Sequence, residues 1–334
     1  MNKKKVYVYP TILEGETKKN PYILCLLEGL KSGSYEVVNF TKNGKKGISD
    51  VFQHLDSNIF IINWPENLAD RRFGFIQVIF YLFFLLIAKV KNTKLVWVMH
   101  NKEAHNKSSF LSNMCMFFTA KLSTFVLTHS VEGVDYFKKK YKKDNIFNFP
   151  HPVYPNLSFP LDVEPRYDFI IWGSIDPYKN IISFLSFVKE NPQHKNYTFL
   201  ICGKCKNEQY AQQISSLIKD LPNITFINEF LKDNELAKYI AESKSILYTY
   251  NQSSVLSSGA LIYSLSSHKK IIGPNFGNFK ELAEDKIIAT YSHFGEIFEI
   301  YDTFNADITQ IEHYEHIYTW QKFVEYIAQL EEKF

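Results

Sequence analysis

The stretch YDFIIWGSIDPYKN, residues 167–180, shows best how the chain folds. Its apolar run at residues 167–173 predicts a short buried strand, and residues 181–190 after it predict a helix. Gly173 ends the strand, Pro177 shapes the turn, and Lys179 comes directly before the helix. A short apolar strand, a turn and a helix form the repeating unit of a parallel α/β sheet.

This unit recurs on both sides of a proline-rich segment. Five of the 12 prolines fall between Pro150 and Pro165, and such a segment cannot continue a helix or a central strand. We therefore expect a linker at residues 151–166. Before it, the apolar pattern predicts strands at 6–9, 59–63, 95–99 and 124–128, and helices at 21–30, 71–91, 108–122 and 132–141.

The alternation restarts after the linker. It predicts strands at 167–173, 197–202, 224–227, 246–249 and 270–273, and helices at 181–190, 211–220, 234–242 and 260–266. Two such blocks predict an α/β protein with two Rossmann-like doubly wound domains facing a cleft. We expect residues 1–150 to form the first domain, residues 167–308 the second, and residues 309–334 a C-terminal helix packing back on the first. Ligands of such sheets bind beyond the carboxyl ends of the strands.

Composition excludes several classes of protein. With 334 residues, of which 46% are hydrophobic, the chain is long and apolar enough for two folded domains. A net charge of +3 without a dense arginine stripe argues against nucleic-acid binding. The four cysteines indicate a reducing compartment, and the pair Cys202 and Cys205 lacks the second ligand pair of a zinc site. Because the N-terminus lacks the features of a signal peptide, we expect a cytoplasmic protein.

Residues 73–88 are almost all apolar, but a helix that spans a membrane needs roughly 20 such residues. Basic residues bracket the run: Arg71 and Arg72 precede it, and Lys89 and Lys91 follow it. This pattern is typical of a helix that lies in the membrane interface. A helix fully buried against the sheet explains the run equally well, and both interpretations stay open. The first implies peripheral association with the inner face of a membrane.

Two segments of the second domain suit a phosphate group. Gly173 permits close approach of a ligand, and Lys179 can reach a diphosphate as a point charge. The alternative is an ordinary turn with an exposed lysine. Ser257, Ser258 and Gly259 open a helix after a strand, where free N–H groups and the helix dipole attract anions. The alternative there is a serine that only caps the helix.

These segments resemble the GT-B glycosyltransferases, in particular glycosyltransferase family four and its relatives. GSIDPYKN at 173–180 is similar to their G-x-x-x-x-x-K phosphate loop, and residues 258–281 are similar to their donor-binding region. VWVMHN at 96–101, followed by His105, resembles a first-domain segment of the family. Further matches, in the expected order, are 128–130, 150–154 and 318–322.

The resemblance, together with the positions of Glu14, Trp64 and Glu66 after predicted strands, indicates a set of site residues. His100 and Glu66 are the expected catalytic residues, and Glu14, Trp64, Asn101 and His105 are expected to contact the acceptor. The donor is expected to bind at Gly173, Ser174, Lys179, Phe230, Tyr250, Ser257, Ser258, Gly259, Ala260 and Glu281. The resemblance implies no metal ion and no cofactor besides the donor substrate, a UDP-sugar or GDP-sugar.

The expected reaction is transfer of a sugar from this donor to a glycan or lipid-linked acceptor, as in the synthesis of surface polysaccharides. Two features of family four are missing: an arginine in the phosphate loop, and a pair of glutamates at about 255–263. A catalytically inactive sugar-binding subunit of the same fold therefore stays an alternative, as does an epimerase.

Overall fold

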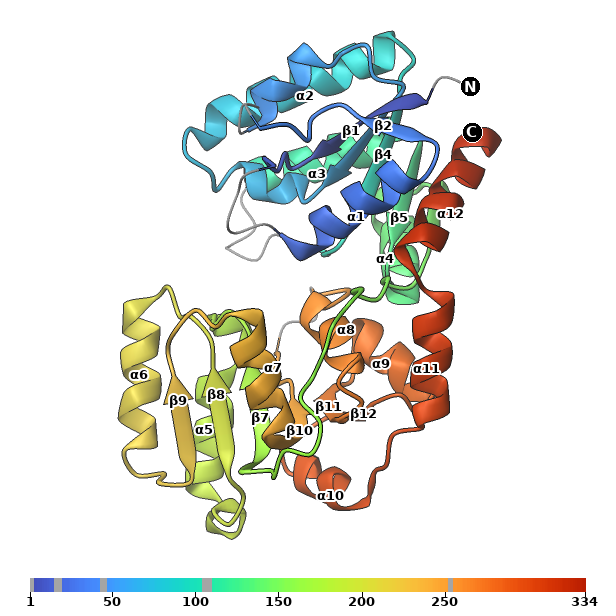
Figure 1. Ribbon diagram of the computed structural model, residues 1–334. Coiled ribbons are helices and arrows are strands. Elements are labelled where there is room, and N and C mark those ends of the chain that lie inside the picture. Colours follow the sequence, from blue (N-terminus) through green and yellow to red (C-terminus); the bar gives the residue numbers. More distant parts are fainter. Residues whose placement is uncertain (1–2, 15–19, 43–46, 104–109, 252–254) are drawn as a thin grey trace. The chain divides into compact units, whose positions relative to one another are not determined.

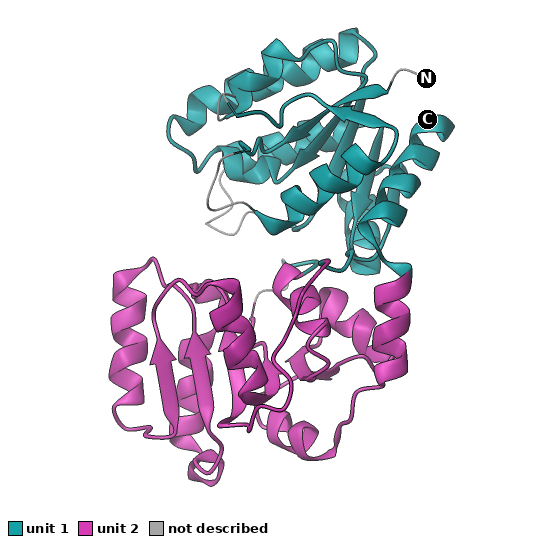
Figure 2. Ribbon diagram, in the orientation of Figure 1, with its two compact units in different colours: residues 1–154, 254–257, 317–334 teal, residues 155–253, 258–316 magenta. Residues whose placement is uncertain are grey.

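The computed structural model describes residues 3–14, 20–42, 47–103, 110–251 and 255–334. The chain forms two compact units, shown in teal and magenta in Figure 2. Unit 1 comprises residues 1–154, 254–257 and 317–334, and unit 2 comprises residues 155–253 and 258–316. Each unit has one six-stranded parallel sheet with helices packed on it (Figure 1), which confirms the predicted α/β class with two doubly wound domains.

The sheet of unit 1 has the strand order β2-β1-β3-β4-β5-β6. Its strands are β1 (Lys4–Tyr9), β2 (Tyr35–Val37), β3 (Ile59–Asn63), β4 (Lys94–Met99), β5 (Phe125–Thr128) and β6 (Ile146–Asn148). Helices α1 (Pro21–Ser32) and α12 (Trp320–Lys333) share a core with one face of this sheet. The other face packs against α2 (Gly74–Val90), α3 (Phe110–Leu122) and α4 (Val131–Tyr141). Two 3-10 helices, Ile48–Gln53 and Pro65–Leu68, complete this unit.

The sheet of unit 2 has the strand order β12-β11-β10-β7-β8-β9. Its strands are β7 (Tyr167–Trp172), β8 (Phe199–Cys202), β9 (Ile224–Ile227), β10 (Ser243–Leu247), β11 (Lys270–Pro274) and β12 (Ala289–Tyr291). Its helices are α5 (Ile181–Glu190), α6 (Glu208–Ile218), α7 (Asp233–Ala241), α8 (Gly259–Leu265), α9 (Gly277–Glu284), α10 (Glu296–Thr303) and α11 (Ile308–Ile317), with 3-10 helices at Pro177–Lys179 and Pro192–His194. Helices α5, α6 and α10 share one apolar core with β7 and β8.

The end of the chain packs on the first unit through α12. Helices α1 and α12 lie side by side and approach closely at Gly29. A methyl group at this position would lie 3.2 Å from Val324 Cγ2 and 3.3 Å from the carbonyl oxygen of Trp320. The single helix expected for residues 309–334 is in fact two helices, and α11 lies mostly in unit 2.

The predicted helix at 71–91 begins three residues later than expected. Phe73 has a left-handed backbone with φ of 58°, and α2 starts at Gly74. A Cβ atom at Gly74 would lie 2.0 Å from the carbonyl oxygen of Ala69, so only glycine permits this approach of the two segments. The chain therefore turns sharply between Asp70 and the helix, and both arginines lie before α2.

Candidate functional site

The loop after β7 carries the predicted phosphate segment and depends on two glycines. Gly173 has φ of +98° and Gly203, after β8, has φ of +139°, a region that side chains rarely adopt. A Cβ atom at Gly203 would lie 1.9 Å from the carbonyl oxygen of Gly173. The two loops therefore lie against each other at the carboxyl ends of neighbouring strands, where ligands of such sheets bind.

Lys179 is buried, so the alternative of an ordinary turn with an exposed lysine is wrong. Its side chain folds back under the loop, and Nζ donates a hydrogen bond of 2.6 Å to the carbonyl oxygen of Trp172. Gly173 makes room for this contact, because a Cβ atom there would lie 2.9 Å from Nζ. The ammonium also lies 5.3 Å from the ring centre of Tyr250. The lysine is thus held at the carboxyl end of β7 by contacts inside unit 2.

Ser258 caps α8, as the simpler of the two interpretations proposed. Its Oγ accepts a hydrogen bond of 3.3 Å from the backbone N–H of Leu261, and its own N–H donates to Asn278 Oδ1. Ala260 lies in the first turn, where its carbonyl accepts a hydrogen bond from the Tyr248 hydroxyl. Helix α8 has only seven residues. The turn therefore contributes one satisfied serine and the backbone of Gly259 and Ala260 to the carboxyl end of the sheet.

The other predicted donor residues lie at different places in unit 2. Ser174 is exposed in the β7 loop, and Phe230, which follows β9, is 64% exposed. Tyr250 follows β10 and is buried, with its hydroxyl 3.5 Å from Ser258 Oγ. Glu281 lies within α9. Tyr250 is thus the predicted aromatic that the structure brings next to both phosphate segments.

A hollow of about 690 Å³ opens beside these residues, beyond the ends of β11 and β12. Aromatic rings and short polar side chains line it together, among them Asn180, Tyr250, Asn275, Phe276, Tyr291 and His293. Rings that pack against a ligand and a few polar groups that orient it are typical of small-molecule sites. Most of this lining was not predicted from the sequence, because β12 has only three residues and its pattern does not show that the segment after it follows a strand.

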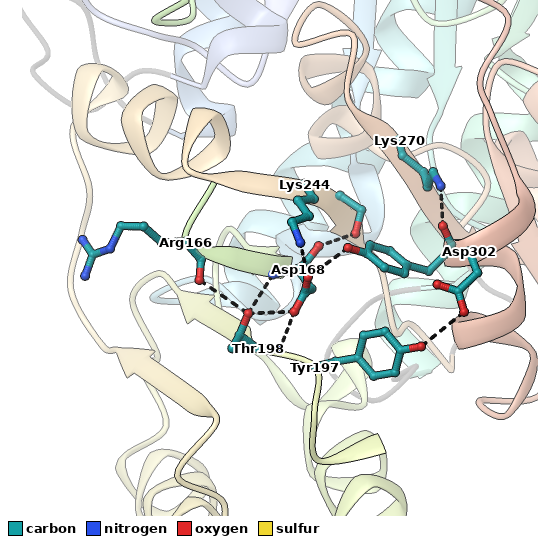
Figure 3. Close-up of polar contacts among 9 residues, drawn as sticks. Arg166, Asp168, Tyr197, Thr198, Lys244, Lys270 and Asp302 are labelled. Carbon is teal, nitrogen blue, oxygen red and sulfur yellow. Dashed lines mark hydrogen bonds and ion pairs between the residues drawn. The ribbon is translucent and has the colours of Figure 1, made fainter. Parts of the chain in front are cut away.

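At the amino ends of the strands of the same sheet, polar side chains form a dense cluster (Figure 3). Asp168, at the start of β7, accepts hydrogen bonds from Thr198, Lys244 and Tyr301. Burial alone would raise the pKa of Asp168, but these hydrogen bonds outweigh it and lower the pKa overall. Because every group in this cluster is paired within unit 2 and lies at the amino ends of the strands, we assign it to stability.

In unit 1, the predicted residues Trp64, Glu66, His100 and Asn101 come together at the ends of β3 and β4. The His100 ring stacks on Trp64 with centroids 4.3 Å apart, and His100 Nε2 lies 3.0 Å from Asn63 Oδ1. His100 is 7% exposed. The ring is thus held in one orientation at the carboxyl end of the sheet.

Glu66 lies in the 3-10 helix after β3 and is buried. Its Oε1 accepts a hydrogen bond of 3.3 Å from Asn101 Nδ2. Burial raises the pKa of Glu66 to about 7, although hydrogen bonds from its own backbone and from Asn101 oppose the shift. A carboxyl group that titrates near neutrality is suited to proton transfer.

Two further histidines lie near His100 and were not predicted as site residues: the ring centre of His129 is 5.6 Å from that of His100, and the ring centre of His151 is 5.0 Å from that of His129. His129 Nε2 lies 2.7 Å from the Tyr22 hydroxyl, and His129 Nδ1 lies 2.7 Å from the carbonyl oxygen of Phe149. Burial, with a smaller contribution from the neighbouring His151, lowers the pKa of His129 to about 3. Burial likewise lowers the pKa of His151 to about 4. Both segments were noted for their resemblance, but nothing in the sequence showed that the rings meet at Tyr22.

Two further predicted acceptor residues are Glu14 and His105. Glu14 is exposed after β1, and its backbone N–H donates to the carbonyl oxygen of Thr41. His105 lies outside the described residues. Within the described ranges, no three His, Cys, Asp or Glu side chains are grouped so that they could hold a metal ion. In the same part of the chain, no helix has the length and apolarity needed to cross a membrane.

A scan against protein-family models found no match to this chain. A search of curated proteins by sequence found none either. Solved structures, in contrast, are similar over nearly the whole chain. HepE from Anabaena in complex with UDP has 13% identity, a TM-score of 0.70, and coverage of 99% of this chain and 100% of that one. Sucrose-phosphate synthase from Thermosynechococcus elongatus has 10% identity, a TM-score of 0.72 and coverage of 99% of both.

A third similar structure is a putative UDP-N-acetylglucosamine 2-epimerase from Listeria monocytogenes, with 11% identity, a TM-score of 0.53 and coverage of 96% of this chain and 93% of that one. At these identities the likeness concerns the fold. The chain has the GT-B fold that the sequence predicted, whereas membership in family four stays a prediction.

Proposed function

We propose that the protein is a glycosyltransferase that moves a hexosyl group from a UDP-sugar or GDP-sugar to a glycan or lipid-linked acceptor. The observation that carries this proposal is Lys179, which is held under the Gly173 loop at the carboxyl end of β7. The GT-B fold supports it, since HepE was solved with UDP and with UDP-glucose. The role proposed for the protein is in surface polysaccharide synthesis in the cytoplasm.

In this proposal, unit 2 binds the donor. An ammonium group has three donors, so Lys179 can keep its hydrogen bond to Trp172 and still donate to a diphosphate oxygen. The backbone N–H groups of Gly259 and Ala260, in the first turn of α8, are the second proposed contact to the diphosphate. The hollow beside Tyr250 and Asn275 offers room for another part of the donor. A cation at the leaving diphosphate stabilises the charge that develops there, and this requires neither a metal ion nor a further cofactor.

Unit 1 supplies the acid–base groups in this proposal. The His100 imidazole accepts a proton from an acceptor hydroxyl or orients that hydroxyl by a hydrogen bond. Asn63 and Trp64 fix the ring for this role. Glu66 acts through Asn101, the residue that follows His100 in the chain, since the Glu66 carboxyl is buried and hydrogen-bonded to the Asn101 amide. Trp64 and Asn101 are the proposed acceptor contacts.

An epimerase is the second candidate, favoured by the fold likeness to a putative UDP-N-acetylglucosamine 2-epimerase. The two reactions differ in their products, because a transferase releases the nucleoside diphosphate and an epimerase returns a nucleotide sugar. Incubating the intact protein with a panel of UDP- and GDP-sugars, and separating the nucleotides, distinguishes them. Binding without any turnover, also in the presence of glycan and lipid-linked acceptors, would instead indicate an inactive sugar-binding subunit.

A further inference from the structure

The outward side of α2 is apolar along its whole length. Seven large apolar side chains of this helix are between 44% and 87% exposed, and they recur on each successive turn: Phe75, Ile76, Ile79, Phe80, Phe83, Leu86 and Val90. Phe73, directly before the helix, is 65% exposed. A helix on the outside of a sheet normally presents polar residues there. We call these eight residues the α2 face.

The opposite side of α2 is equally apolar and is fully used by the fold. Val78, Tyr81, Phe84 and Leu85 are buried in the core against the sheet. The helix is therefore hydrophobic all round, a composition that normally belongs to a helix covered on every side. A helix fully buried against the sheet is therefore the wrong interpretation, because α2 packs on the sheet with one side and exposes the other. An exposed apolar surface of this extent marks an interaction site.

The neighbouring helix extends the apolar surface of unit 1. Helix α3 packs against α2 and exposes three phenylalanines: Phe110 at 81%, Phe117 at 46% and Phe118 at 39%. Phe117 and Phe118 contact each other edge to face, with centroids 5.4 Å apart. Neither helix contains an acidic residue.

Cations lie at both ends of α2. Arg71 and Arg72 precede it and are exposed. At its other end, Lys89, Lys121 and Lys143 line one hollow of about 370 Å³. Burial lowers the pKa of Lys143, and the charges of Lys121 and Lys89 lower it further, because the three ammonium groups lie near one another. An apolar strip with cations at each end is complementary to a surface of acyl chains beneath phosphate groups.

We propose that the α2 face docks on the surface of a bilayer that contains anionic lipids. The apolar side chains enter the boundary between headgroups and acyl chains, and the terminal arginines and lysines contact lipid phosphates. A second copy of the chain fits less well. A symmetric dimer through this face would bring the cationic ends of one α2 against those of the other, whether the helices ran parallel or antiparallel. The docking concerns unit 1 and is independent of the donor site proposed for unit 2.

The test is flotation of the full-length protein with two kinds of vesicle, phosphatidylcholine alone and phosphatidylcholine with phosphatidylglycerol. At low salt the protein should float with the anionic vesicles, and salt should release it. Phe75→Gln combined with Phe83→Gln should weaken binding at least tenfold, because both rings are more than half exposed and leave the core intact. Lys89→Gln and Lys121→Gln should each weaken it about fivefold.

Leu161→Gln is the matched control, since Leu161 is 86% exposed in unit 2 and outside this face. It should float like the unchanged protein. Failure of the protein to float with anionic vesicles, or equal flotation of the double phenylalanine variant, would overturn the proposal. The proposal would also be overturned if light scattering showed that the unchanged protein is a dimer and that the double phenylalanine variant is a monomer. UDP or GDP affinity, measured on the same samples, reports on the proposed function alone and should not change.

Discussion

Lys179 Nζ donates a 2.6 Å hydrogen bond to the carbonyl oxygen of Trp172, seven residues earlier in the chain. The bond closes the loop that joins β7 to α5 and places a buried cation at the carboxyl end of the sheet. The same lysine thus has two tasks in our account, to stabilise the loop and to hold the donor diphosphate. The two can be measured separately.

Lys179→Ala should weaken binding of UDP or GDP ten- to a hundredfold, because a hydrogen bond to a charged group contributes about 1.5–3 kcal/mol. It should also lower the free energy of unfolding by about 1–3 kcal/mol, since the buried carbonyl of Trp172 loses its donor. Calorimetry and denaturant unfolding measure the two effects. Lys219→Ala, at an exposed position in unit 2, is the control and should change neither. Unchanged nucleotide affinity in a folded Lys179→Ala protein would falsify the donor role.

Gly173→Ala should move the lysine without removing it. The new methyl group would lie 2.9 Å from Nζ, and the flexible lysine side chain can yield, while the positive φ costs about 1 kcal/mol. We expect a folded protein with weaker nucleotide affinity. In Gly203→Ala the new methyl group would instead lie 1.9 Å from the backbone carbonyl oxygen of Gly173, which cannot yield, so we expect little folded protein. Equal expression and equal affinity of the two variants would contradict this account of the loop.

Glu66→Gln should make stability less dependent on pH. The pKa of Glu66 is about 7 in the folded protein and about 4.5 when it is exposed. Its contribution is therefore fully present below pH 4.5 and is lost as the pH rises towards 7. The variant should gain stability relative to the unchanged protein across this window, on the order of 3 kcal/mol in all. Urea unfolding of both proteins at a series of pH values tests this, and parallel curves would show that Glu66 ionises normally.

His129→Gln should show the opposite sign. The pKa of His129 is lowered to about 3, from an ordinary value of 6.5, so the folded protein binds the proton less well than the unfolded chain. The stability that this neutral ring contributes is present above pH 6.5 and is lost as the pH falls towards 3. The variant should lose less stability on acidification, although it is less stable at neutral pH because the Tyr22 and Phe149 contacts are disturbed. Thermal melts at pH 7 and pH 5 compare the two.

His100→Ala should reduce kcat about a hundredfold or more, the range of general acid–base catalysis, and leave donor affinity unchanged. His100→Gln keeps a hydrogen-bonding group toward Asn63 but cannot transfer a proton near neutral pH. If the glutamine variant were as active as the unchanged protein, His100 would have only a positioning role.

The sequence predicted most of the architecture because apolar strands alternate with helices. Residues 59–63, 224–227 and 181–190 were predicted with the bounds that the structure has. The strands β2, β6 and β12 were missed, since each has three residues and lies at a sheet edge or next to the linker, too short for a period to show.

The site was harder to predict than the fold. Trp64, Glu66, His100 and Asn101 follow two adjacent strands and lie together in the structure, whereas their roles stay predictions. The burial of Lys179 could not be seen, because it depends on the left-handed backbone of Gly173 and on a turn that reverses the side chain. The rings of His129 and His151 meet at Tyr22 only through the fold, since they come from three separate segments.

The central claim is that this protein transfers a sugar from a nucleoside diphosphate to an acceptor. The most direct measurement is the release of UDP or GDP from a panel of nucleotide sugars, with glycan and lipid-linked acceptors present, by the intact protein and by its Lys179→Ala variant. The account predicts that one donor yields its nucleoside diphosphate and that the variant yields far less at the same donor concentration. Return of an epimerised nucleotide sugar, or no release from any donor, would contradict it.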